Sequence, residues 1–188
     1  MRNKFTISII GDSVLSESHI NYLRAIELGK KLIDNDFYII HGGRGGIMEA
    51  ITIGAKQSSK YHEGCVIGIL PGLDINDKNN YLDIAIPTGL DVMRNAIVVN
   101  TDAVIAIGGG AGTLSEIALA WTMNKLIIAY KGEGWSGKLA GTKLDNKKRL
   151  NYKDDKIFSV VNADDAINIC KELIPIYKGK RKLISDNL

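Results

Sequence analysis

The stretch AVIAIGGGAGTLSEIALAW, residues 103–121, joins an apolar run, a cluster of glycines and a helical pattern. Its first five residues, 103–107, are apolar and rich in branched side chains, which is typical of a strand buried on both faces. The glycines that interrupt this run are Gly108, Gly109, Gly110 and Gly112. The apolar residues that follow at the spacing of one helix face are Leu114, Ile117, Ala118 and Trp121. The stretch therefore predicts a strand, a glycine loop and a helix, in that order.

This junction predicts an anion-binding site. The first turn of a helix carries unpaired backbone N–H groups and the positive end of the helix dipole, so a phosphate binds there favourably. Glycines allow the backbone angles that the turn needs and leave no side chain in the way of a ligand. A structural alternative is open for the same residues, because residues 113–116 read TLSE and match a capping box. In that interpretation Thr113 caps the helix and Glu116 bonds to the Thr113 N–H.

Outward from this stretch, strand patterns alternate with helical patterns. Strands are predicted at residues 5–10, 37–40, 65–70, 82–86, 126–130 and 157–161. Helical patterns cover residues 20–33, 47–54, 90–97 and 163–174. Repeated alternation of this kind predicts a parallel sheet covered on both faces, with right-handed crossovers. We therefore expect an α/β fold with a Rossmann-like doubly wound parallel sheet, formed as a single domain by residues 1–177, followed by a basic C-terminal tail at residues 178–188.

Composition restricts the function only weakly. The 188 residues contain 24 Lys and Arg against 21 Asp and Glu, and a net charge of +3 does not call for nucleic acid or a membrane surface. Two cysteines are too few for a disulfide framework, and no signal peptide or membrane-spanning run is apparent, so we expect a cytoplasmic protein. His19, His41 and His62 show no metal-ligand spacing, so no metal site is predicted and these residues are expected at the surface or in loops.

Four glycine-bearing loops follow the predicted strands, at residues 11–13, 42–46, 71–72 and 108–112. Loops that leave parallel strands for helices emerge at one edge of the sheet, which is where ligands bind in such folds. The four loops together predict a cleft for a phosphorylated ligand. The candidate phosphate-binding and ligand-binding residues are Gly11, Ser13, Gly42, Gly43, Gly45, Gly46, Gly109, Gly110, Gly112 and Thr113.

Standard nucleotide motifs fit poorly. The first strand is not followed by G-x-G-x-x-G, which argues against a standard dinucleotide site. Residues 132–138 read GEGWSGK and have the outline of a P-loop, but Leu139 stands where a magnesium-binding Ser or Thr belongs. No helical pattern follows, so we interpret this similarity as coincidental and residues 131–156 as a mobile surface loop.

Several motifs resemble a known family over about residues 6–130. Residues 109–116, GGAGTLSE, match the GGxGTxxE motif of the Lonely Guy family of cytokinin riboside monophosphate phosphoribohydrolases. Residues 42–49, GGRGGIME, resemble its GGxxGxM signature, and residues 68–71, GILP, resemble its GIxP turn. Three other segments resemble molybdenum-cofactor carrier proteins and their bacterial relatives more closely than they resemble the hydrolases. These segments are Thr88-Gly89, Arg94-Asn95 and residues 108–120.

The chain also departs from the hydrolases. Gly108 stands where the hydrolases usually carry a proline. Their arginine belongs to an Arg-Lys pair that begins one position earlier relative to the central strand, where this chain has Met93, and here Asn95 follows Arg94. These differences concern catalysis and leave phosphate binding unaffected.

The resemblance implies one of two functions. A hydrolase would cleave the N-glycosidic bond of a nucleoside 5′-monophosphate without any cofactor, with Glu116 as the base and Arg94 across the cleft as the catalytic residues. A carrier would hold molybdenum cofactor or another phosphorylated ligand without cleaving it. From the residues alone, Arg94 could equally form a surface ion pair with Asp91, three residues earlier.

Partners follow from the same comparison. The resemblance implies a homodimer or homotetramer that binds a small phosphorylated molecule and no membrane. A nucleic-acid contact by Lys178, Lys180, Arg181 and Lys182 is not expected, because the tail lacks interleaved aromatic residues.

Overall fold

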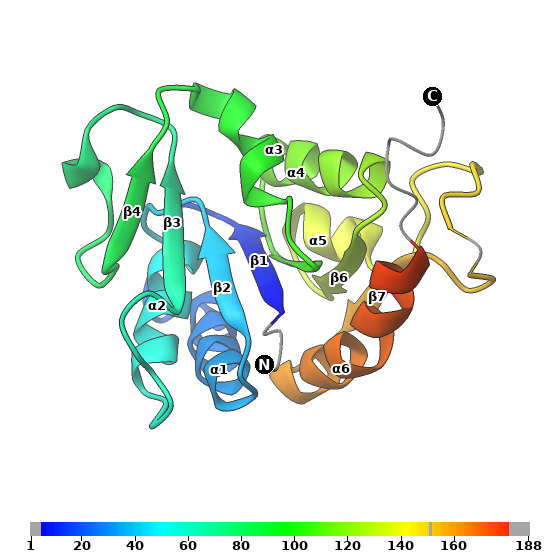
Figure 1. The fold of residues 1–188 in the computed structure, drawn as a ribbon, viewed down its shortest axis with the longest axis horizontal. Coiled ribbons are helices and arrows are strands. Elements are labelled where there is room, and N and C mark those ends of the chain that lie inside the picture. Colours follow the sequence, from blue (N-terminus) through cyan, green and yellow to red (C-terminus); the bar gives the residue numbers. More distant parts are fainter. Residues whose placement is uncertain (1–4, 151, 181–188) are drawn as a thin grey trace.

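The computed structural model describes residues 5–150 and 152–180, and within them the chain forms one parallel sheet of seven strands (Figure 1). The strands run in the spatial order β4-β3-β2-β1-β5-β6-β7. Their bounds are Thr6–Gly11 (β1), Tyr38–His41 (β2), Val66–Leu70 (β3), Ile84–Pro87 (β4), Ala103–Ile107 (β5), Leu126–Tyr130 (β6) and Ile157–Val160 (β7). Each predicted strand is present within two residues of its expected ends. The expected Rossmann-like α/β fold is therefore confirmed.

Helices cover both faces of the sheet (Figure 1). The α-helices are Ile20–Asp34 (α1), Ile47–Lys56 (α2), Asn95–Val98 (α3), Ala111–Thr122 (α4), Gly134–Leu139 (α5) and Ala163–Lys180 (α6). Two 3₁₀ turns lie at Ile75–Asp77 (η1) and Asp91–Arg94 (η2). Apolar side chains of α1, α2 and α6 form the core on one face, whereas α3 and α4 pack on the other. None of the helices described is long and apolar enough to cross a membrane.

The site is placed by the order of the strands. The chain builds outward from β1 to β4 on one side, then returns to place β5 on the other side of β1. Residues on β1 pair in register with both neighbours, since Ile9 lies opposite His41 of β2 and opposite Ile105 of β5. The loops that leave these strands therefore start side by side, and the reversal between β1 and β5 opens a crevice there.

The helix predicted at residues 90–97 exists, but its apolar face is not buried. It is divided into η2 and α3, and Leu90, Met93 and Ile97 are 46%, 73% and 47% exposed. Only Asn95 and Val98 of this short segment are buried against the rest of the chain. The spacing of apolar residues predicted the helix, but it could not predict which face of the helix packs against the rest of the chain.

Residues 131–156 are not irregular throughout, as the sequence suggested for a surface loop. They contain α5, whose Ser136 is buried, and the side chain of Arg149 forms an ion pair of 2.6 Å with Asp155. Asp155 also accepts a hydrogen bond from Tyr177 on α6. These contacts join the segment to the body of the molecule, and Asn151 lies outside the described residues.

The structure describes only residues 178–180 of the C-terminal tail predicted at residues 178–188. Helix α6 continues to Lys180, so residues 178–180 are helical, while Arg181 and Lys182 lie outside the described residues. The ammonium of Lys178 lies 3.7 Å from Asp102 and over the ring of Phe5.

Two glycines set the distance between α1 and α2. Gly54 of α2 faces α1, where an added Cβ would lie 1.9 Å from the carbonyl oxygen of Ile26. An added Cβ on Gly29 would lie 2.2 Å from the carbonyl oxygen of Ile51. The two helix backbones therefore touch.

We expect Gly54→Ala to lower the free energy of unfolding by about 1–3 kcal/mol, because the backbone of α1 must move away. Gly112→Ala is the matched control, since nothing lies within 4 Å of an added Cβ in that first helical turn. Urea denaturation of the three proteins measures the difference. Equal loss of stability in both variants would contradict the close packing of α1 on α2.

Candidate functional site

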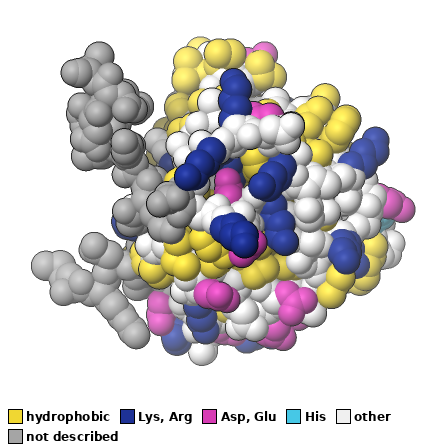
Figure 2. Space-filling view, turned by 90° about the vertical axis from the view of Figure 1, so that its right-hand side faces the viewer, with side chains coloured by type: hydrophobic (Ala, Val, Ile, Leu, Met, Phe, Trp, Pro, Cys, Tyr) yellow, Lys and Arg dark blue, Asp and Glu magenta, His cyan; other side chains and the backbone are white. Residues whose placement is uncertain are grey.

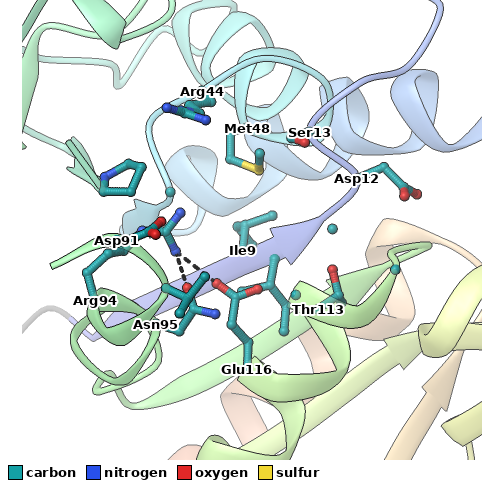
Figure 3. Close-up of a pocket in the computed structure, with 17 residues that line it drawn as sticks. Ile9, Asp12, Ser13, Arg44, Met48, Asp91, Arg94, Asn95, Thr113 and Glu116 are labelled. Carbon is teal, nitrogen blue, oxygen red and sulfur yellow. Dashed lines mark hydrogen bonds and ion pairs between the residues drawn. The ribbon is translucent and has the colours of Figure 1, made fainter.

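A pocket of about 390 Å³ lies at the carboxyl ends of the central strands (Figure 3). It brings together residues from segments far apart in the sequence. The predicted site residues that line it are Gly11, Ser13, Gly42, Arg94, Gly110, Gly112, Thr113 and Glu116. Pro71 also lines it, so all four glycine-bearing loops reach the pocket.

The other predicted glycines, Gly43, Gly45, Gly46 and Gly109, are not among its lining residues. Gly43 and Gly46 have positive φ angles of 79° and 62°, which favour glycine. An added Cβ on Gly46 would also lie 2.3 Å from the carbonyl oxygen of Asp12. These two glycines shape the turn between β2 and α2 from behind the pocket.

The glycine loop before α4 is fixed by hydrogen bonds to its own amides. The Gly108 N–H donates to the hydroxyl of Ser136 at 2.7 Å, and the Gly109 N–H donates to the carboxylate of Asp12 at 2.8 Å. Backbone N–H groups of Trp135 and Ser136 in turn donate to the carbonyls of Gly109 and Gly108. The Gly109 amide is therefore already paired. Residues 132–138, which have the outline of a P-loop, form hydrogen bonds to the glycine loop through Trp135 and Ser136.

Amides further along remain open to a ligand. The first N–H groups of a helix have no partner within it, and α4 begins at Ala111 with Gly110 as its N-cap. Gly110 contributes no side-chain cap, and nothing lies within 4 Å of an added Cβ on Gly110 or Gly112. The backbone here faces open space in the pocket.

The capping-box interpretation of residues 113–116 is wrong. The helix starts two residues before Thr113, so Thr113 lies in its first turn and does not cap it. The helix is also rotated relative to expectation, because Thr113, Glu116, Ile117, Ala120 and Trp121 are its buried residues. Leu114 and Ala118, predicted to face the core, do not belong to this set. Two polar residues face inward because they line the pocket.

Arg94 and Glu116 form an ion pair within the pocket (Figure 3). Nη1 of Arg94 lies 3.2 Å from Oε1 of Glu116, and the two side chains are only 13% and 10% exposed. The same Nη1 donates to Oδ1 of Asn95 at 2.6 Å, and Asn95 donates to Ser115 on α4. Among the described residues, Arg94 therefore forms its ion pair with Glu116 and not with Asp91, the partner that its spacing also allowed.

Gly42 leaves room for this guanidinium. An added Cβ on Gly42 would lie 2.7 Å from Nη2 of Arg94. Within the part of the chain that the structure describes, Nε of Arg94 is buried without a hydrogen-bond partner. The pocket thus holds a guanidinium with donor capacity that the protein does not use.

Burial sets the protonation of the pair. Removal from water raises the pKa of Glu116 from 4.5 to about 7, although the charge and hydrogen bond of Arg94 act in the opposite direction. Burial likewise lowers the pKa of Arg94, while Glu116 opposes that shift. A carboxyl group that titrates near neutral pH can accept or donate a proton during a reaction.

Sequence reasoning missed several pocket residues, including Asp12, Arg44, Asp91 and Asn95. Arg44 is half-exposed at the mouth, and its guanidinium lies 3.9 Å from Asp77. Arg44 lies inside the second glycine motif and Asp12 directly follows β1, so position alone could have marked both. Nothing local signals Asp91, which lies at the pocket with a positive φ of 48°.

His41 was expected at the surface or in a loop, and this is wrong. Its ring is fully buried at the end of β2, where Nδ1 accepts the N–H of Gly43 and Nε2 lies 3.0 Å from the hydroxyl of Thr52. Burial lowers the pKa of His41 to about 3, so the ring stays neutral and supports the glycine turn. Among the described residues no group of three or more His, Cys, Asp or Glu side chains could hold a metal ion.

Comparison with known proteins identifies the family. The sequence model of the SLOG cluster4 family matches residues 4–165. The chain belongs to this family. An uncharacterised relative from Archaeoglobus fulgidus is 37% identical over 126 residues, which are 66% of this chain and 79% of the relative.

Solved structures of this family's fold agree with the architecture. The molybdenum cofactor binding protein of Rippkaea orientalis is 30% identical, with a TM-score of 0.75 over 93% of this chain and 99% of that one. The Moco carrier protein of Chlamydomonas reinhardtii is 26% identical, with a TM-score of 0.73 over the same shares. The resemblance to the carrier branch is thus confirmed.

The coupling between Arg94 and Glu116 can be tested by titration. We expect the Glu116 carboxyl to titrate near pH 7 by ¹³C NMR, and we expect Arg94→Gln to raise that pKa, because Arg94 supplies both of the influences that lower it. The pKa of Glu116 in the folded protein lies above its ordinary value of 4.5, so the folded state binds this proton more tightly than the unfolded state. The contribution of Glu116 to the free energy of unfolding should therefore be largest below pH 4.5 and decline as the pH rises toward 7.

Arg44→Gln is the matched control for the loss of a pocket cation. Arg44 acts on Arg94 but is not among the groups that shift Glu116, so its loss should leave the Glu116 titration near pH 7. An Arg94→Gln protein with an unchanged or lowered Glu116 pKa would contradict the pairing.

Proposed function

We propose that the pocket binds a phosphate monoester of a heterocyclic compound, with its phosphate at the first turn of α4. The observation that carries this proposal is the open backbone at Gly110 and Gly112, in the same pocket as two arginines, Arg44 and Arg94. Unpaired amides and the helix dipole favour a phosphate, and the arginines add positive charge nearby. Nucleoside 5′-monophosphates and pterin cofactors both carry such a group.

The Arg94–Glu116 pair favours hydrolysis as the activity of this pocket. Glu116 would accept a proton from water as the water attacks the anomeric carbon, and its negative charge would stabilise the oxocarbenium-like transition state. The bond from that carbon to the base nitrogen breaks, the base takes up the proton that Glu116 accepted, and free base and ribose 5-phosphate leave. Arg94 would position the ribose or stabilise negative charge on the departing base. No cofactor is required for these steps.

A carrier function is the second candidate, and the similarity to the molybdenum cofactor proteins of Rippkaea and Chlamydomonas favours it. The open turn at Gly110 and Gly112 would hold the phosphate of that ligand as well as a nucleotide phosphate. Binding alone requires no general base. Glu116 would then serve to hold Arg94 in place.

The phosphate position can be tested with a charged side chain at Gly112. We expect Gly112→Asp to weaken binding of nucleoside 5′-monophosphates at least about tenfold, because a carboxylate then occupies the place proposed for the phosphate. Gly112→Asn is the matched control of equal size without charge. An acidic residue in the first turn stabilises a helix, so unfolding should not explain the loss. Equal affinity in the Asp and Asn variants, measured by calorimetry, would contradict the proposal.

Chromatography of nucleoside 5′-monophosphates after incubation with the protein distinguishes the two functions. For a hydrolase we expect release of free base that falls by about 10²-fold or more in Glu116→Gln. Binding of a phosphate monoester without consumption would establish the carrier function. Release of base at an unchanged rate in a folded Glu116→Gln protein would remove Glu116 from the mechanism.

We further propose that the protein is a homodimer or homotetramer, assembled through the exposed apolar side chains of η2 and α3. Val92 and Met93 are 67% and 73% exposed beside the pocket. Isolated apolar residues are common at surfaces, but a contiguous group marks an interface. We expect light scattering to give a multiple of 20.5 kDa and Met93→Lys to shift the mass toward the single chain. Val161→Lys is the control at an exposed valine outside this group, and a monomeric wild type would contradict the assembly.

A further inference from the structure

A second cavity, of about 210 Å³, lies near the opposite end of α4 from the first pocket. Its lining includes Trp121 of α4, Arg149 and four lysines, Lys143, Lys147, Lys148 and Lys153. This side of the molecule faces the viewer in Figure 2, which shows Lys and Arg side chains gathered near the centre of the face. The proposed function uses none of these residues.

The floor of the cavity is a fixed network. The side chain of Arg149 is only 4% exposed, and its guanidinium donates to both oxygens of Asp155 at 2.6 and 3.0 Å. It also donates to the carbonyl of Trp121 and lies 3.6 Å from the centre of the Trp121 ring. Tyr177 donates a further hydrogen bond to Asp155. The charges of Arg149 and Asp155 therefore compensate each other within the floor.

The rim of the cavity carries an excess of positive charge. Lys143, Lys147, Lys148 and Lys153 are exposed, and none of them forms an ion pair with the residues that the structure describes. Asp155, an acidic residue in the lining, is already paired with Arg149. Four lysines thus line one small cavity whose lining contains a single carboxylate, that of Asp155.

We propose that this cavity binds a short oligophosphate, either inorganic or the phosphate chain of a nucleoside triphosphate. Several like charges around a concave surface attract a small, multiply charged anion. Lysine ammonium groups on flexible stems suit a ligand whose charges are distributed along a chain. A cavity of this size encloses a short anion, whereas a nucleic-acid strand requires an extended groove. The site is separate from the pocket at the first turn of α4 and does not depend on its function.

Calorimetry at low salt with tripolyphosphate and, separately, with ATP tests the site. We expect both to bind, and we expect Lys147→Gln/Lys148→Gln to weaken binding about tenfold through the loss of two charge contacts. Lys30→Gln/Lys60→Gln is the matched control, because it removes two exposed lysines from α1 and the loop after α2. The control should retain the wild-type affinity. Stronger binding of ATP than of tripolyphosphate would identify a nucleoside triphosphate as the preferred source.

Tryptophan fluorescence locates the bound anion. The chain has two tryptophans, so Trp135→Phe leaves Trp121 as the single reporter in the cavity. We expect tripolyphosphate to change its emission, with the same dependence on concentration as the calorimetric signal. Gly112→Asp should retain this response, because the change lies in the other pocket.

Four outcomes would overturn the proposal. The first is no binding of tripolyphosphate to the wild-type protein, and the second is equal affinity in the two double-lysine variants. The third is loss of tripolyphosphate binding in Gly112→Asp, which would place the anion at the first turn of α4. Single-stranded DNA that binds to the Lys147 and Lys148 surface and is not displaced by tripolyphosphate would also overturn it.

Discussion

The structure depends on the two hydrogen bonds that hold the amides of Gly108 and Gly109. They connect the end of β5 to Asp12 after β1 and to Ser136 in α5, so three separate segments determine the path of one short loop. That path decides where α4 begins. Because α4 begins at Ala111, Thr113 and Glu116 face inward, and Glu116 reaches Arg94. A loop of the same sequence without these acceptors could begin its helix at another residue and turn Glu116 away.

Burying the charged pair of Arg94 and Glu116 costs free energy. Removing two charges from water costs several kcal/mol per ion in a protein interior, and their mutual attraction recovers this only with good geometry. The structure supplies part of that geometry through Asn95, which binds Arg94 and is itself bound to Ser115. Two observations show that the burial is not fully compensated. Nε of Arg94 has no hydrogen-bond partner among the described residues, and the pKa of Glu116 is raised. An interior that tolerates such a pair at a pocket wall is organised for a ligand and not for maximum stability.

Much of the fold could be predicted from sequence because its signals are local. A run such as residues 103–107 has the composition of a buried parallel strand wherever it occurs, and glycines after each strand mark the loops. The position of the pocket could also be predicted, because the topology of a parallel sheet brings the loops after its strands to one edge of the sheet. The pairing of Arg94 with Glu116 did not follow, because they lie 22 residues apart and meet only when η2 packs on α4.

Local signals also misled where tertiary contacts decide. The capping-box pattern at residues 113–116 is a property of four residues, whereas the actual helix start depends on Asp12, about a hundred residues earlier in the chain. The segment 131–156 shows no periodicity, and its order comes from Arg149, Asp155 and Tyr177, which no local pattern connects. His41 looked like a loop residue because only the folded chain places Thr52 and Gly43 around its ring.

The two proposed anion sites lie near opposite ends of α4. At its first turn the backbone itself presents donors in a fixed arrangement, which suits a single phosphate of defined geometry. At its other end the helix dipole is negative and would repel an anion. Arg149 donates a hydrogen bond to the carbonyl of Trp121 at that end, and the surrounding lysines supply the positive charge that would attract an anion. The first proposed site would therefore select its ligand by shape through the backbone, whereas the second would select its ligand by charge through flexible side chains.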